Sequence, residues 1–233
     1  MKSVDFMLNQ VPLLMKSLPV TLEILVLSVI IALILGILLT YAKIGSNKWL
    51  SSLASLYISF MRGTPMLVQL LLVFVGLPLL LGSMGLSTDS WNTIIYAIIA
   101  FSLNEAAFFS EIFRAAFRAI DKGQIEAGES IGLTSWQIFW IVILPQTAAR
   151  ALPNTTNMII ELLKNTSLGL AIGVTDILAQ AKQLSSLNYG VGQSEIFIVA
   201  ALMYWMLSVI LTTISHHIYI RLNRFNSHYQ FSK

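Results

Sequence analysis

Four polar residues recur at helical spacing inside an otherwise apolar segment. Asn154, Asn157, Glu161 and Asn165 are separated by three, four and four residues, so an α-helix would place all of them on one face. Lys164 borders this stripe. Glu161 and Lys164 could bind the charged groups of a small polar molecule, or they could neutralise each other and hold helices together. The asparagines favour a wet interior surface under either interpretation.

Other polar residues interrupt two further apolar segments. Asn104 and Glu105 lie in one, and Thr64 and Gln69 lie in the other. Polar groups at membrane depth are costly and are therefore functional candidates, although each of these could instead make an interhelical hydrogen bond. The sequence has no cysteine, no Ser/His/Asp set and no cluster of metal ligands. We therefore predict neither a catalytic site nor a metal site.

The apolar segments that contain these polar residues are expected to form helices that cross a membrane. Of the 233 residues, 56% are hydrophobic and 11% are charged, and the mean hydropathy is +0.78, which excludes an ordinary water-soluble protein. A span needs roughly 20 apolar residues, so we predict an all-α polytopic membrane protein with about five transmembrane helices. The expected spans are residues 18–41, 50–81, 91–117, 148–173 and 196–220. With no long-period repeat or linker, residues 1–233 are expected to form a single domain.

The distribution of Lys and Arg predicts the orientation. Ten of the fourteen would lie on one side, and that side is expected to be cytoplasmic. Lys2, Lys16 and Lys182 would lie on the other side, and Lys164 lies inside a span. This places the N-terminus outside and the C-terminus in the cytoplasm. Because the cations flank spans and do not form one patch, a nucleic-acid partner is not expected. The ten are Lys43, Lys48, Arg62, Arg114, Arg118, Lys122, Arg150, Arg221, Arg224 and Lys233.

The cytoplasmic loop at residues 119–146 has the pattern of a helix-turn-helix. Asp121 and Gln124 have the spacing of an N-cap and N3 pair, and Gly132 stands where a glycine ends a helix. Thr134 and Gln137 form a second capping box, which opens a helix that Pro145 is expected to end. The hairpin could simply fill space between spans. Its half-apolar surface instead favours a partner that covers it.

The same loop resembles the EAA loop of permease subunits of bacterial ABC importers. That pattern is Glu-Ala-Ala, three residues, Gly, nine residues, Ile, one residue and Leu-Pro. Gly128 replaces the third alanine and Val142 replaces the isoleucine, and Gly128 should loosen the helix by up to about 1 kcal/mol relative to Ala. The resemblance implies an ATPase-coupling loop formed by Glu126, Ala127, Gly128, Gly132, Leu133, Leu144 and Pro145.

Further segments resemble the polar amino-acid branch of these permeases, the type I importers that carry His, Glu, Gln, Arg or opines. They extend the resemblance to about residues 15–222. The segments are Arg62-Gly63-Thr64-Pro65 with Gln69-Leu70, Glu111 to Arg114, Pro145-Gln146, and Lys164-Asn165-Thr166-Ser167-Leu168. Residues 57–65 and 120–124 look closest to cystine permeases.

The resemblance implies several partners. A dimer of cytoplasmic ABC ATPases, holding ATP and Mg²⁺, would dock on the coupling loop and switch the permease between inward-open and outward-open forms. A second permease subunit, the same chain or a related one, and an extracytoplasmic amino-acid-binding protein would complete the assembly in the lipid of a bacterial cytoplasmic membrane. This chain has no Gly-x-x-x-x-Gly-Lys-[Ser/Thr] loop. We therefore expect it to be no enzyme and to hold no cofactor itself.

The implied substrate is a polar amino acid, whose ammonium and carboxylate both need fixed partners inside a membrane. Glu161 could receive the ammonium, and Lys164 or the hydroxyls of Thr166 and Ser167 could receive the carboxylate. We therefore expect the substrate pathway to include Thr64, Gln69, Asn104, Glu105, Asn157, Glu161, Lys164, Asn165, Thr166 and Ser167. The alternative is an ion-coupled secondary transporter that uses Glu161 as its ion site, although an odd number of spans without an inverted repeat fits this poorly.

Overall fold

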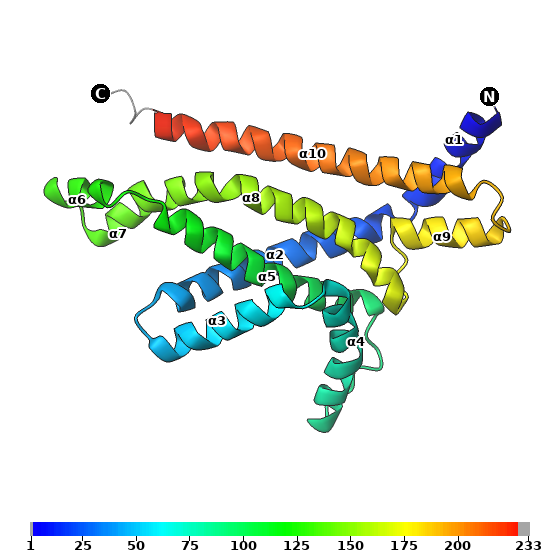
Figure 1. The fold of residues 1–233 in the computed structure, drawn as a ribbon, viewed down its shortest axis with the longest axis horizontal. Helices are drawn as coiled ribbons and strands as arrows, with labels where there is room; N and C mark the ends of the chain where they lie inside the picture. Colours follow the sequence, from blue (N-terminus) through cyan, green and yellow to red (C-terminus); the bar gives the residue numbers. More distant parts are fainter. Residues whose placement is uncertain (1, 228–233) are drawn as a thin grey trace.

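The computed structural model describes residues 2–227, and this part of the chain consists of helices joined by short loops, with no strand (Figure 1). Met1 and residues 228–233, which include Lys233 of the orientation argument, lie outside the described residues. The elements are α1 (Lys2–Met15), α2 (Leu18–Ile44), α3 (Lys48–Gly63), α4 (Met66–Ser83), α5 (Thr93–Arg118), α6 (Lys122–Ser130), α7 (Ser135–Ile138), the π-helix η1 (Phe139–Ile143), α8 (Leu144–Asn165), the 3₁₀-helix η2 (Thr166–Ile172), α9 (Ile177–Leu187) and α10 (Gln193–Ser227).

Four described helices are long and apolar enough to cross a membrane, namely α2, α4, α5 and α10. A fifth candidate is the pair formed by Ser135–Ile172 and Ile177–Leu187, which bends by 51° at its break. This range of four to five agrees with the expected number of about five. The expected spans 18–41 and 196–220 fall within α2 and α10. The expected span 91–117 begins two residues before α5, and the expected span 148–173 overlaps the first helix of the bent pair and ends one residue beyond it.

The central element of the fold is α5. In α5, 67% of the most apolar stretch is buried inside the protein. The corresponding share is 28% in α2, 11% in α4 and 22% in α10. Helix α2 approaches α5 closely because Gly36 has no side chain: a Cβ there would lie 2.9 Å from the Cβ of Phe109. The hydroxyl of Thr40 adds a hydrogen bond of 3.1 Å to the carbonyl oxygen of Ser110. Polar side chains on α5 are therefore held within the protein.

The expected second span, residues 50–81, is two helices separated by a break. Helix α3 ends at Gly63 and α4 begins at Met66, and only α4 is apolar and long enough to be a candidate span. In the sequence, Pro65 after Thr64 predicts an N-cap followed by a first helical proline, and so a kink or a fresh helix start at this point. The fresh start is confirmed, but the assignment of the two positions is wrong. Pro65 itself is the N-cap of α4, and the Thr64 hydroxyl donates 2.8 Å back to the carbonyl oxygen of Phe60. In Figure 1, α4 points away from the other helices.

The break also moves one cation from its expected place. Arg62 was counted with the cytoplasmic residues, but its guanidinium lies over the ring of Phe108, 5.4 Å from the centroid. Phe108 precedes Arg118, the last residue of α5, by ten residues, which is roughly 15 Å along a helix. Arg62 therefore lies beside the middle of α5 and not at its end.

The sequence predicts that the helix beginning after Thr134 ends at Pro145, and this prediction is wrong. Helical backbone continues through α7, η1 and α8. Proline lacks an N–H, and its ring clashes with the carbonyl four residues earlier in an α-helix. The π-helix widens the turn before Pro145, and the Leu144 N–H bonds to the Phe139 carbonyl oxygen, five residues back. Pro145 therefore shapes this helix without terminating it.

The two ends of the molecule carry different elements (Figure 1). The hairpin of α6 and α7 lies at one end, together with the C-terminal end of α10. The N-terminus and α9 lie at the other end. The predicted orientation requires this separation of the N-terminus from the hairpin and the C-terminus.

Candidate functional site

The polar stripe of α8 forms an exposed face of the described chain. Asn154, Asn157, Glu161 and Lys164 are all exposed, and Asn165 is half-buried. Glu161 and Lys164 make no ion pair with each other within the described chain, so the interpretation that they neutralise one another does not fit. A charged, unpaired face on a candidate membrane span is costly in lipid. This face therefore needs water or a polar partner beside it.

The two hydroxyl side chains that follow α8 donate hydrogen bonds to nearby backbone carbonyls. Thr166 is fully buried and donates 2.8 Å to the carbonyl oxygen of Leu163. Ser167 donates 2.7 Å to the carbonyl oxygen of Lys164. Both hydroxyls satisfy carbonyls at the end of α8. The burial of Thr166 separates it from the exposed stripe, whereas Ser167 is only half-buried.

Three predicted pathway residues form one buried network around the break between α3 and α4. The side-chain amide of Gln69 donates to the Met61 carbonyl oxygen at 2.8 Å and to the Thr64 hydroxyl at 2.7 Å. Asn104 of α5 donates to the Gln69 side-chain oxygen at 2.8 Å and to the same Met61 carbonyl at 3.2 Å. Pro65 has no N–H to offer Met61, four residues earlier. The two amides replace that missing donor and join α4 to α5.

Glu105 lies outside this network. It is 2% exposed, and its Oε2 atom is buried without a hydrogen-bond partner in the described chain. Glu161 of α8 lies close enough for the two carboxyl groups to interact electrostatically. These acids lie on α5 and α8, two helices that pack against each other, which their distance in the sequence does not indicate.

Glu111, six residues further along α5, is paired. Its carboxylate binds Lys43 of α2 and accepts a hydrogen bond of 2.5 Å from Arg114. The spacing of Glu111 and Arg114 is visible in the sequence, but the pairing with α2 is not. This cluster fixes α2 to α5 near the hairpin end.

A second buried carboxylate, Asp176, was not among the residues predicted from the sequence. It is fully buried, accepts a hydrogen bond of 2.9 Å from the N–H of Ala179 as the N-cap of α9, and receives the Tyr204 hydroxyl of α10 at 2.6 Å. An Asp directly before an apolar helical segment is the signal that could have identified it. Its hydrogen bonds hold α9 against α10.

At the other end of the molecule, helix caps determine where the helices α6 and α7 of the hairpin begin and end. Asp121 caps α6 by accepting from the N–H of Gly123 at 3.0 Å. Gly132 has φ +84°, and the Leu133 N–H bonds to the Gly128 carbonyl oxygen at 3.1 Å, as in a Schellman motif. Thr134 and Gln137 form the complete predicted capping box. These local interactions confirm the helix-turn-helix.

The first and second helices of the hairpin touch where Gly128 lies. A Cβ on Gly128 would be 3.0 Å from Cγ1 of Ile138, which is 1% exposed. The glycine that departs from the family pattern therefore permits close packing in this hairpin. Glu126 and Ala127 are exposed, as are Ile131 and Trp136, whereas Leu133, Leu144 and Pro145 are half-buried. The hairpin thus presents one acidic and apolar surface and packs its other side on itself.

Two side chains connect the hairpin to the helices on either side of it. Gln146 at the start of α8 bonds to the side chain of Gln124 in α6. Arg150 of α8 donates to the carbonyl oxygen of Ala119, just after α5. The predicted bond from Gln124 back to Asp121 is replaced by this contact with α8. A displacement of the hairpin would therefore pull directly on α5 and α8.

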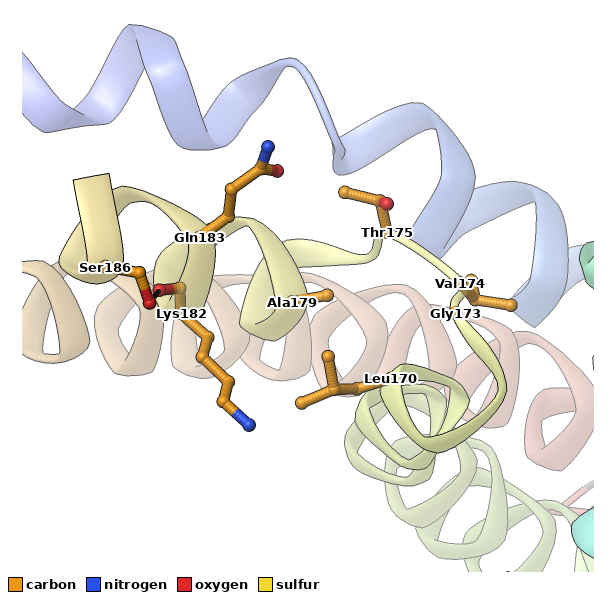
Figure 2. A pocket seen from close by; sticks show the side chains of 8 residues that line it. All are labelled: Leu170, Gly173, Val174, Thr175, Ala179, Lys182, Gln183 and Ser186. Carbon is orange, nitrogen blue, oxygen red and sulfur yellow. Dashed lines mark hydrogen bonds between the residues drawn. The ribbon is translucent and has the colours of Figure 1, made fainter.

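A pocket of about 290 Å³ opens at the opposite end, between η2 and α9 (Figure 2). Lys182 and Gln183 extend from α9 in different directions, and none of the predicted pathway residues lines the pocket. Its lining residues are Leu170, Gly173, Val174, Thr175, Ala179, Lys182, Gln183 and Ser186.

Comparison with known proteins gives consistent matches over most of the chain. Residues 6–224 match the family described as binding-protein-dependent transport system inner membrane component. The chain is 41% identical over 206 residues to the probable amino-acid permease protein YxeN of Bacillus subtilis, covering 88% of this chain and 89% of that protein. It is 41% identical over 201 residues to the L-cystine transport system permease protein TcyL of the same organism, covering 86% and 83%.

A solved structure agrees with these relatives. The crystal structure of an amino acid ABC transporter with histidines contains a chain that is 32% identical. The TM-score is 0.79, and the match covers 92% of this chain and 96% of that one.

Proposed function

Because the chain belongs to the family of binding-protein-dependent transport system inner membrane components, we propose that it conducts a polar amino acid, with cystine the first candidate, into the cell. The chain is the permease subunit of a bacterial polar amino-acid ABC transporter and a multi-pass protein of the inner membrane. It is not catalytic: a partner ATPase binds and hydrolyses the ATP with Mg²⁺. The N-terminus lies outside the cell in this proposal, and the hairpin and C-terminus lie in the cytoplasm.

The substrate pathway runs along the exposed face of α8, and this face is the observation that carries the proposal. Asn157, Glu161 and Lys164 are exposed and Glu161 and Lys164 are unpaired at the depth of a candidate span. Glu161 receives the ammonium of the amino acid and Lys164 receives its carboxylate, so that neither charge enters hydrocarbon without a partner. A second permease subunit, the same chain or a related one, covers this face and encloses the pathway.

The ATPase dimer docks on the hairpin and moves it. An exposed surface that carries Glu126, Ile131 and Trp136 on a firmly capped turn supports this part of the proposal. The bonds from Gln124 to Gln146 and from Arg150 to Ala119 carry the displacement into α5 and α8. An extracytoplasmic binding protein delivers the amino acid at the opposite end.

Cystine is favoured because TcyL is named as a cystine permease and is 41% identical.

Glu161→Gln tests the pathway and the substrate together. The transporter is reconstituted in vesicles with its ATPase and binding protein, and uptake of cystine, arginine and glutamine is measured. We expect the substitution to reduce uptake at least tenfold while the amount of assembled complex stays within twofold of wild type. Glu23→Gln, an exposed carboxylate on α2, is the matched control. Equal loss of uptake and assembly would assign Glu161 a structural role, and faster uptake of another amino acid would reject cystine.

A further inference from the structure

The pocket of about 290 Å³ between η2 and α9 has walls that local interactions hold in place (Figure 2). Gly173 ends η2 at φ +83°, and the Val174 N–H bonds to the carbonyl oxygen of Gly169 at 3.0 Å. A Cβ on Gly169 would lie 3.1 Å from the Cβ of Val174, so the missing side chain permits this close turn. On the α9 side, the buried Asp176 receives the Tyr204 hydroxyl at 2.6 Å. Both walls are therefore fixed before any ligand arrives, which suits a binding site.

The polar groups that line this pocket are free to bind a ligand. Lys182, Thr175 and Gln183 are exposed, and their side chains make no hydrogen bond or ion pair within the described chain. Of the described residues that line the pocket, only Lys182 is charged, and the apolar part of the lining includes Leu170 and Val174. Small-molecule sites combine an apolar lining with a few polar groups in this way. The lone cation favours a ligand that carries an anionic group.

The pocket lies at the outer end of the polar stripe of α8. Helix η2 continues α8 directly, and Leu170 of η2 lines the pocket six residues after Lys164. At about 1.5–2 Å per residue, this is roughly 10 Å along the chain. Helix α9 lies at the same end of the molecule as the N-terminus, which the proposed orientation places outside the cell (Figure 1). A molecule that enters from outside therefore meets Lys182 before it reaches Lys164.

The charge of the lining indicates which part of an amino acid binds here. Every free amino acid carries an α-carboxylate and an α-ammonium, and Lys182 attracts the first and repels the second. Lys182 and Gln183 extend in different directions (Figure 2), so they do not hold the same group. The side-chain oxygen of Gln183 can accept a hydrogen bond from the ammonium. A site of this kind recognises what all amino acids share and does not select among their side chains.

We propose that this pocket is an entry subsite, in which Lys182 binds the α-carboxylate of the incoming amino acid before Lys164 receives it. This rests on the proposed function and deepens it by adding a binding position outside the polar stripe. A charge-assisted hydrogen bond from an ammonium to a carboxylate is among the stronger polar contacts. Two such cations in succession keep the carboxylate paired as the molecule leaves water.

A single introduced cysteine can report on the pocket, because the chain has none of its own. Ser186→Cys places a thiol on the lining, and the rate at which a maleimide modifies this thiol is measured in the purified transporter complex without the binding protein. We expect L-arginine and L-glutamine to slow the modification on the order of fivefold when their concentration exceeds the Kd severalfold. Argininamide, which lacks the carboxylate, should leave the rate unchanged. Leu187→Cys, at the next and equally exposed position outside the lining, is the control and should show no protection.

A second substitution tests the role of the cation. Lys182→Gln, combined with Ser186→Cys, should abolish the protection by both amino acids. Lys16→Gln, which changes another exposed lysine outside the pocket, should preserve it. Protection by argininamide equal to that by arginine, or protection that survives Lys182→Gln, would overturn the assignment to a carboxylate.

Two other occupants would also overturn the inference. If the binding protein without amino acid protects the thiol and free amino acids do not, the pocket is a docking position for that protein. If anionic lipid slows the modification relative to neutral lipid and amino acids do not, the pocket holds a lipid headgroup. ATP-driven uptake by the wild-type complex with its binding protein is measured in parallel. Normal uptake without protection refutes this inference alone, whereas a complex that takes up none of the amino acids refutes the proposed function.

Discussion

At the residue scale, the contacts around the Met61 carbonyl oxygen follow from the backbone N–H that Pro65 lacks. Pro65 cannot donate to the Met61 carbonyl oxygen, and the side-chain amides of Gln69 and Asn104 donate in its place. The sequence identified Gln69, Thr64 and Asn104 as polar residues in apolar segments and left open whether they bind substrate or each other. The structure shows that they bind each other. Nothing in the sequence spacing indicates this, because Gln69 and Asn104 meet only after α4 has turned away from α3.

Removing the central amide of this network should destabilise the protein. Gln69→Leu removes the donor to the Thr64 hydroxyl and leaves one N–H of the buried Asn104 amide without its acceptor, which costs about 1–3 kcal/mol. We expect a lower midpoint of thermal unfolding in detergent, measured by the fluorescence of the tryptophans. The adjacent substitution Val68→Leu, on an exposed position, should leave the midpoint unchanged. A midpoint equal to wild type in Gln69→Leu would mean that the network does not hold the break between α3 and α4.

At the element scale, the hairpin was the part of the fold best predicted from sequence. Caps and turn glycines act over three or four residues, so Gly132 and the pair Thr134 and Gln137 could be identified directly. The end of the second helix could not be predicted, because a π-helix before Pro145 is a rare solution that keeps the helix continuous. The bond between Gln124 and Gln146 depends on that continuity.

The left-handed conformation of Gly132 gives a local test of the hairpin. An alanine there must adopt φ near +84°, which costs on the order of 1 kcal/mol. Gly132→Ala should therefore increase hydrogen exchange of the amides of α6 by on the order of fivefold. Gly123→Ala is the matched control: a Cβ at position 123 meets its nearest atom at 3.6 Å, an ordinary contact, and alanine favours a helix. Unchanged exchange in Gly132→Ala would contradict the proposed stability of the turn.

The exposed acid of the hairpin tests its docking on the ATPase. Glu126→Lys reverses an exposed charge that makes no hydrogen bond or ion pair in the described chain, so the fold of the permease should survive. We expect co-purification with the ATPase to be lost. Glu23→Lys, an equivalent change on exposed α2, should leave co-purification intact. If the Glu126→Lys permease still retains the ATPase at wild-type yield, the partner binds elsewhere.

At the scale of the whole molecule, the chain combines a well-packed centre with polar surfaces that a lone membrane protein would not expose. Helix α5 is the most buried of the candidate spans, whereas α8 presents Asn157, Glu161 and Lys164. Composition and hydropathy predicted the helical membrane class and about five spans because these depend only on local sequence. The packing of α5 against α8 and the outward course of α4 could not be predicted, since both depend on how separate helices cross.

The most direct test of the account is amino-acid accumulation by vesicles of defined composition. Vesicles that contain this chain alone, under an imposed ion gradient, are compared with vesicles that also contain its ATPase and binding protein with ATP inside or outside. The account predicts no accumulation by the chain alone and accumulation by the complete assembly only when ATP is on the hairpin side. Uptake against a gradient by the chain alone, driven by ions, would contradict it.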